Sequence, residues 1–142
     1  MIKTRRAFGV FLVTVALVVG PAAFMAIAAK GGRPVAGASG ATLDVVNVDQ
    51  TDPVLNYGDT ATFVVDTSAT GRPFVQLSCY QGGDLVYSQS AGFFADYPFR
   101  QTYQLSSVYW TAGAANCVAE LYYFTSTGRE RVIATLNFPV AA

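Results

Sequence analysis

Apolar and polar side chains alternate with a period of two between residues 42 and 140, which is the pattern of half-buried β-strands. In the segment 74–80 one face carries Gln, Ser and Tyr, and the other carries Val75, Leu77 and Cys79. We expect seven strands with this alternation, at residues 42–48, 60–67, 74–80, 85–90, 102–105, 115–124 and 131–140. No stretch of this region carries the apolar spacing of a helix.

Clusters of turn-forming residues separate the expected strands. The segments 56–59 (Asn-Tyr-Gly-Asp), 81–84 (Gln-Gly-Gly-Asp) and 126–129 (Ser-Thr-Gly-Arg) are turn sequences, and the second is a strong hairpin signal. Seven short strands separated by turns over about 100 residues predict an all-β fold, a single antiparallel β-sandwich. A domain of this size can bury a core without a metal or a cofactor.

The passage into the sixth expected strand resembles that of immunoglobulin-like domains, in the order Leu105, Trp110, Gly113, Cys117. The resemblance covers residues 42–140 and implies a bacterial secreted immunoglobulin-like or fibronectin-like β-sandwich. Ala115 stands where such domains place the tyrosine of the tyrosine corner, and the other cysteine lies in the third expected strand instead of the second. The resemblance is therefore not to an antibody-type domain.

Residues 1–28 have the composition of a membrane-targeting segment. Lys3, Arg5 and Arg6 form a positively charged start, and residues 7–29 then carry no charge. The sequence Ala-Ile-Ala at 26–28 matches the small-x-small pattern of a signal-peptidase site, so cleavage would leave a chain that begins near Ala29. The uncharged run is also long enough to span a bilayer as an uncleaved hydrophobic helix, and both readings stay open.

The export route and the junction with the domain follow from neighbouring residues. The pair Arg5-Arg6 resembles a twin-arginine export motif, but Gly9 stands where a second hydrophobic residue is usual, so the route stays open. Residues 29–41 contain four Gly and one Pro, which predicts a flexible linker. We therefore expect the β-sandwich domain to occupy residues 42–142.

The formal net charge of zero conceals an uneven distribution. From Ala41 onward, four Arg and no Lys stand against nine Asp and Glu, which gives this part a net charge of −5. A negative domain without a basic cluster argues against a nucleic-acid partner. The chain contains no His, so it lacks the commonest general base and the commonest transition-metal ligand, and we expect no cofactor.

Catalytic signatures are missing from the sequence. It contains no GxSxG, SxxK, HExxH, phosphate-binding-loop or dinucleotide motif, and its only two Glu are Glu120 and Glu130. Asp44, Asp49 and Asp52 lack the spacing of a calcium loop and are expected to form turns. We therefore do not expect an enzyme.

Cys79 and Cys117 are the only cysteines, and two cysteines in an exported chain predict a disulfide bond. Both fall in the inward-facing sets of strands that are expected to be neighbours. Closing this loop would stabilise the fold by roughly 3–4 kcal/mol in the chain-entropy description. A reactive or metal-binding pair would need a CxxC spacing or a nearby His, and the chain has neither.

Two groups of aromatic residues are candidate binding surfaces. Tyr80, Tyr122 and Phe124 are expected together on the outer face of the sheet, with Tyr87 nearby from the following hairpin. Exposed aromatic faces bind sugars, peptides and proteins, although Tyr is also an ordinary outward residue of strands.

The segment 91–99 (AGFFADYPF) is the second candidate, since four of its nine residues are aromatic. Phe93 and Phe94, with Phe99, either plug an open end of the sandwich or present a sticky tip to a partner or a membrane surface. Trp110 is expected to pack over the edge of the core near the disulfide.

The sequence favours a non-enzymatic, extracytoplasmic binding module whose partner is a protein or a glycan at the cell surface. Membrane contact is expected only through residues 7–29, if they are not cleaved. Two alternatives are a structural or spacer domain of a membrane-anchored protein, and a secreted inhibitor-like protein that acts through residues 91–99.

Overall fold

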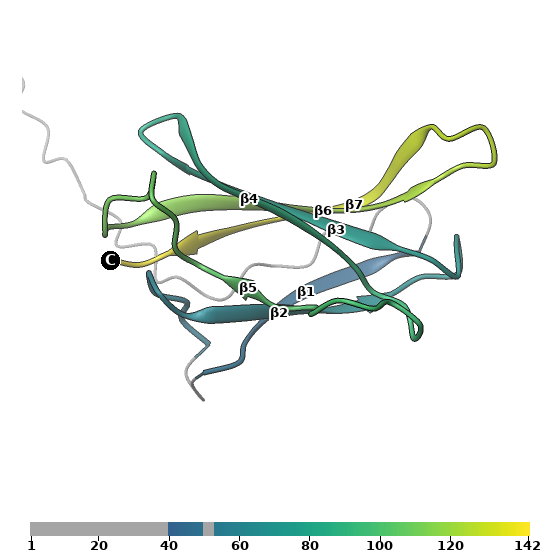
Figure 1. Cartoon of the computed structure of the whole chain (residues 1–142), viewed down its shortest axis with the longest axis horizontal. Helices are drawn as coiled ribbons and strands as arrows, with labels where there is room; N and C mark the ends of the chain where they lie inside the picture. The colour runs from purple at the N-terminus through teal and green to yellow at the C-terminus, as the bar shows by residue number, and fades with distance from the viewer. Residues whose placement is uncertain (1–39, 50–52) are drawn as a thin grey trace, which may run out of the picture.

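The computed structural model describes residues 40–49 and 53–142 of the chain (Figure 1). The predicted targeting segment and nearly all of the predicted linker lie outside the described residues. Within those ranges the fold is all-β, with two antiparallel sheets stacked face to face as a β-sandwich. No helix in the described part of the chain is long and apolar enough to cross a membrane.

Seven strands form the two sheets, as the alternation predicted. The three-stranded sheet has the order β1–β2–β5, with β1 at Thr42–Asn47, β2 at Thr60–Asp66 and β5 at Tyr103–Gln104. The four-stranded sheet has the order β4–β3–β6–β7, with β3 at Phe74–Gln81, β4 at Asp84–Gly92, β6 at Ala115–Phe124 and β7 at Glu130–Val140. The chain crosses between the sheets after β2, after β4 and after β5.

The core lies between the sheets and is built from the inward-facing side of each strand. Val75, Leu77 and Cys79 of β3 are fully buried, and their outward neighbours are partly or largely exposed. Leu43 and Ala61 bury their side chains from the opposite sheet. The most deeply buried larger side chains of the core are Tyr103, Leu43, Leu77, Leu105, Leu121 and Leu136. The predicted inward set of β3 is thus confirmed.

The β3–β4 connection is the tight hairpin that the Gly-Gly pair predicted. Gly82 has a φ of 58° and Gly83 a φ of 100°, a left-handed backbone in which side chains are disfavoured. Gly58 at φ 93° closes the turn before β2, where the Asp59 amide donates to the Asn56 carbonyl oxygen at 3.1 Å. Both predicted turns are confirmed.

The strand directions give the sandwich two distinct ends (Figure 1). The end at which β1 begins is called the N-side end. It also holds the β2–β3, β4–β5 and β6–β7 connections. The C-side end holds the β1–β2 and β5–β6 connections, the β3–β4 hairpin and the C-terminus. Ala41, which was expected to close the linker, is fully buried, so the packed part of the chain begins one residue earlier.

Trp110 closes the core at the C-side end, as expected. Its indole is buried and meets the rings of Tyr57 and Tyr87 edge-on, with centroids 5.5 and 6.3 Å away. The indole Nε1 donates to the Gly113 carbonyl oxygen at 2.9 Å, which satisfies its only polar atom. Tyr87 lies opposite Cys79 in the β3–β4 register, so the indole packs close to the disulfide.

Candidate binding surface

An aromatic cluster covers the N-side end of the outer face of the four-stranded sheet. Its rings come from the start of β3, from the β4–β5 connection and from the end of β6, and they touch one another in an unbroken series. The members of this aromatic cluster are Phe74, Phe94, Tyr97, Phe99, Tyr122 and Phe124.

Phe74 is the centre of the aromatic cluster because it is the outward neighbour of the fully buried Val75. It lies opposite Tyr122 in the β3–β6 register, and the two rings stack with centroids 5.7 Å apart. The rings of Phe94 and Phe124 meet it edge-on at 5.5 and 5.7 Å. Cross-strand aromatic pairs of this kind stabilise a sheet as well as forming a surface.

Tyr122 belongs to the outer face but is buried under its neighbours. Its hydroxyl shares a hydrogen bond with the Ser90 hydroxyl at 2.8 Å, and the Phe124 ring covers it edge-on at 5.5 Å. The expectation that Tyr122 is exposed is therefore wrong, because aromatic neighbours that the strand alternation does not reveal cover it. Phe124 is exposed as expected, with 53% of its surface accessible.

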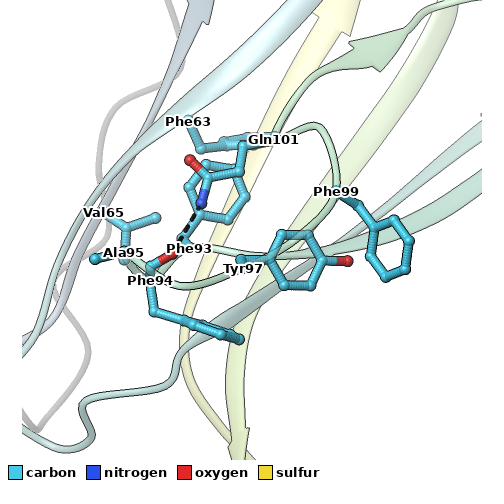
Figure 2. Close-up of a pocket in the computed structure, with 8 residues that line it drawn as sticks. All are labelled: Phe63, Val65, Phe93, Phe94, Ala95, Tyr97, Phe99 and Gln101. Carbon is cyan, nitrogen blue, oxygen red and sulfur yellow. Dashed lines mark hydrogen bonds between the residues drawn. The ribbon is translucent and has the colours of Figure 1, made fainter.

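Phe93 and Phe94 were expected to share one role, but the structure places the two rings differently. Phe93 turns inward, where its ring stacks on Tyr103 at 6.4 Å and meets Phe63 edge-on at 6.1 Å, and so it plugs the sandwich. Phe94 turns outward onto Phe74 and Tyr97. Figure 2 shows the two rings on opposite sides of the connection. Phe99 does not plug the end, since 72% of its surface is exposed.

Gly92 allows the connection to fold back over the sheet. A Cβ atom at this position would lie 2.4 Å from Cε1 of Phe94 and 2.6 Å from Cδ2 of Tyr97, closer than any real contact. The absence of a side chain therefore makes room for both rings at the end of β4.

An arginine borders the aromatic cluster. The guanidinium carbon of Arg72 lies 5.1 Å from the centroid of the Phe94 ring, a distance at which cation–π attraction operates. Arg72 also forms an exposed ion pair with Asp96 of the same connection. The two contacts tie the β2–β3 and β4–β5 connections together beside the rings.

A pocket of about 490 Å³ lies between β2 and the β4–β5 connection (Figure 2). The Gln101 amide donates to the carbonyl oxygens of Gly92 at 2.8 Å and Phe94 at 3.4 Å and thereby shapes the connection. The surface that this pocket presents is mainly polar, although most of its lining residues are apolar in type: Phe63, Val65, Phe93, Phe94, Ala95, Tyr97, Phe99 and Gln101. Tyr97 is the only titratable residue in this lining.

Tyr80 and Tyr87 lie apart from the aromatic cluster. Tyr80 is exposed, but it lies opposite Asn116 at the C-side end of β3, because the late residues of one antiparallel strand meet the early residues of the next. Tyr80 and Tyr122 therefore do not form one group, and that expectation is wrong.

Tyr87, which was expected on the surface, is buried. An irregularity in the β3–β4 register between Cys79 and Tyr80 places Tyr87 opposite Cys79 and hence toward the core. Its hydroxyl donates to Oε1 of Gln89 at 2.7 Å, and burial raises the pKa of the Tyr87 phenol to about 12.

Cys79 and Cys117 form the predicted disulfide, with the sulfurs 2.01 Å apart. The two residues are directly opposite in the β3–β6 register and are buried. The bond therefore joins neighbouring strands within one sheet, whereas the disulfide of antibody domains joins the two sheets. Its burial marks it as a structural bond and not a reactive pair.

The structure adds Phe74 and Arg72 to the predicted surface, together with Tyr97, which the sequence offered only as one of the four aromatic residues of segment 91–99. Phe74 could have been found from the sequence, because the inward assignment of Val75 puts its neighbour outside. Arg72 could not, since it reaches the surface through an irregular connection, and for the same reason the ring contacts of Tyr97 with Phe94 and Phe99 could not. Within residues 40–49 and 53–142 no group of three or more His, Cys, Asp or Glu side chains could hold a metal ion.

Comparison of the chain with profiles of protein families, with curated proteins and with solved structures finds no match. The surface must therefore be interpreted from its own geometry and chemistry.

Proposed function

We propose that this protein is a non-enzymatic, extracytoplasmic binding module of the immunoglobulin-like or fibronectin-like kind, whose contact surface is the aromatic cluster. The exposure of Phe99 and Phe124, each more than half accessible on a rigid support of packed rings, carries this proposal. Large apolar side chains grouped on a soluble surface mark interaction sites, because exposing them to water is unfavourable.

The preformed arrangement of the aromatic cluster supports a binding role. Phe74 holds both Phe94 and Phe124 by edge-on contacts, and Gln101 fixes the connection from the other side. A surface that is already ordered loses little conformational entropy when a partner arrives.

Two features of the chain, its disulfide and its first 28 residues, support the extracytoplasmic location. The disulfide fits an oxidising compartment, and the first 28 residues carry the charge and hydrophobicity of a targeting segment. The arrangement of three plus four strands, with crossings between sheets, supports the kinship with immunoglobulin-like sandwiches.

Photo-crosslinking in intact cells tests this function. A benzophenone side chain is placed at Phe99, and a matched one at Val108, which is 93% exposed at the opposite end of the domain. We expect a defined adduct of higher mass from position 99 and none from position 108. A third probe at Phe124 repeats the test. Absence of any adduct at positions 99 and 124 would favour a spacer domain and contradict the proposal. Equal labelling at positions 99 and 108 would contradict it as well.

A further inference from the structure

The arginines of the folded part are all at one end of it. Arg72 lies in the β2–β3 connection, Arg100 in the β4–β5 connection, and Arg129 and Arg131 in the β6–β7 hairpin. All four side chains are exposed, and all three connections belong to the N-side end that carries the aromatic cluster. No other Arg or Lys follows residue 33 in the sequence.

The acidic residues have a different distribution, so the domain is electrically asymmetric. In and beside the connections at the N-side end, four arginines stand against Asp66, Asp96 and Glu130, a net charge of +1. Asp44 and Glu120 lie farther along β1 and β6 in the same half of the domain. At the C-side end, the described residues carry three negative charges and no positive one, on Asp49, Asp59 and Asp84. Among the described residues, positive side chains are therefore found only at the end with the exposed rings.

The strand that follows the expected membrane-targeting segment begins at this same end. β1 begins at the N-side end, and ten residues, 30–39, separate Gly40 from the uncharged run 7–29. Ten residues span at most about 36 Å when fully extended. A domain tethered through residues 7–29 therefore keeps its N-side end within reach of the bilayer.

We propose that the N-side end docks on an anionic phospholipid surface, with Phe99 and Phe124 entering the headgroup region and Arg100, Arg129 and Arg131 on the phosphates. This assignment rests on the proposed function, because it names the partner of the same aromatic cluster. Aromatic rings favour the interface between water and lipid, and guanidinium groups bind phosphate oxygens through two hydrogen bonds.

The rest of the domain favours an end-on orientation. The C-side end carries only negative charge among the described residues, so an anionic surface repels it within about a Debye length, roughly 8–10 Å at physiological salt. The long Arg side chains can bring their charge to the phosphates while their methylene stems pack beside the rings. Attraction at one end and repulsion at the other orient the domain with its strands pointing away from the bilayer.

Fluorescence of the full chain reconstituted in phospholipid vesicles tests the docking. The natural Trp110 lies buried at the C-side end and supplies the baseline emission. Phe99→Trp and, separately, Val108→Trp place a second indole at the N-side and C-side ends, and the vesicles contain phosphatidylglycerol with bromine-labelled acyl chains. We expect the indole at position 99 to be quenched at least threefold more than the one at position 108.

Charge and lipid controls separate docking from simple tethering. In phosphatidylcholine vesicles, we expect the quenching at position 99 to fall to the level seen at position 108. In anionic vesicles, we expect the double variant Arg129→Glu, Arg131→Glu to reduce the quenching at position 99. Equal quenching at positions 99 and 108 in anionic vesicles, or undiminished quenching in phosphatidylcholine, overturns the assignment. Phe124→Trp repeats the measurement if Phe99→Trp does not fold.

The two proposals fail in different ways. A protein or glycan adduct at position 99 in cells, with no lipid quenching of the same position, overturns membrane docking and leaves the binding module standing. Lipid adducts in cells together with lipid quenching support both.

Discussion

The hydroxyl of Tyr103 on β5 donates a hydrogen bond across the core to the carbonyl oxygen of Val75 on β3, at 2.9 Å. The bond joins the three-stranded sheet to the four-stranded one, and the Tyr103 side chain is completely buried. The backbone of β5, which is only two residues long, pairs with β2 inside the three-stranded sheet, so it is through the Tyr103 side chain that β5 bonds to the opposite sheet.

Removing this hydroxyl should destabilise the domain. We expect Tyr103→Phe to lower the free energy of unfolding by about 1–2 kcal/mol, since a buried hydrogen bond is lost with little change in shape. Urea denaturation followed by fluorescence measures the loss. Tyr109→Phe removes a hydroxyl from a side chain that is 75% exposed and should leave the midpoint unchanged.

The buried tyrosines should make stability fall at alkaline pH. Burial raises the pKa of Tyr87 to about 12 and raises that of Tyr103 further still, whereas a tyrosine in the unfolded chain ionises near pH 10. The stabilisation that comes from these two protonated phenols is therefore complete below about pH 10. As the pH rises from 10 toward 12, the unfolded chain loses these protons before the folded one does, and the free energy of unfolding falls by about 1.4 kcal/mol per pH unit for each group.

Urea midpoints between pH 8 and pH 12 check this dependence. Tyr87→Phe should make the decline above pH 10 shallower, and Tyr109→Phe should not. A stability that stays constant from pH 9 to pH 12 in the unsubstituted protein would contradict the assignment.

The strands and the inward-facing residues followed from the sequence because each depends on local alternation and on nearby turn residues. The Gly82-Gly83 hairpin and the Val75, Leu77, Cys79 set were predicted in this way. Tyr87 was misplaced, because an irregularity at Tyr80 shifts the register of the neighbouring strand and no local pattern marks it.

Loss of the disulfide should be the costliest single change to the covalent structure. Removing Cys79–Cys117, which closes a separation of 38 residues, should lower the free energy of unfolding by about 3–4 kcal/mol. The double variant Cys79→Ala, Cys117→Ala gives this value in urea denaturation. Mass spectrometry of the exported protein, alkylated with and without reductant, should show two thiols only after reduction.

Asp59 should be the most sensitive carboxylate of the domain. It is buried, and its Oδ2 accepts hydrogen bonds from the Asn56 amide at 2.8 Å and from the side-chain amide of Asn47 at 3.0 Å. Asp59→Ala leaves these donors unmatched and should cost about 1–3 kcal/mol. Asp66→Ala at an exposed position is the control and should change the thermal midpoint by no more than measurement error.

Gly92→Ala should displace the aromatic cluster. The added methyl group would overlap the rings of Phe94 and Tyr97, so the β4–β5 connection must move away from the sheet. This movement should lower the free energy of unfolding by about 1–3 kcal/mol. Nuclear magnetic resonance should show shift changes at Phe74 and Tyr122. Gly71→Ala, which meets no atom within 4 Å, should leave those shifts in place.

The candidate surface was predictable only in part, for a physical reason. Phe124 and Phe94 were named because aromatic residues are conspicuous in a sequence. Their association with Phe74 depends on strand register, and their association with Arg72 depends on the path of two irregular connections, which local patterns do not determine.

The start of β1 and the end of β7 lie at opposite ends of the domain, which bears on how the domain responds to force (Figure 1). A pull applied between the start of β1 and the end of β7 acts along the strand axes, perpendicular to the hydrogen bonds of the β1–β2 and β6–β7 ladders. Bonds sheared in this way must rupture together instead of one after another. The fold is therefore a stiff link between whatever is joined to its two ends.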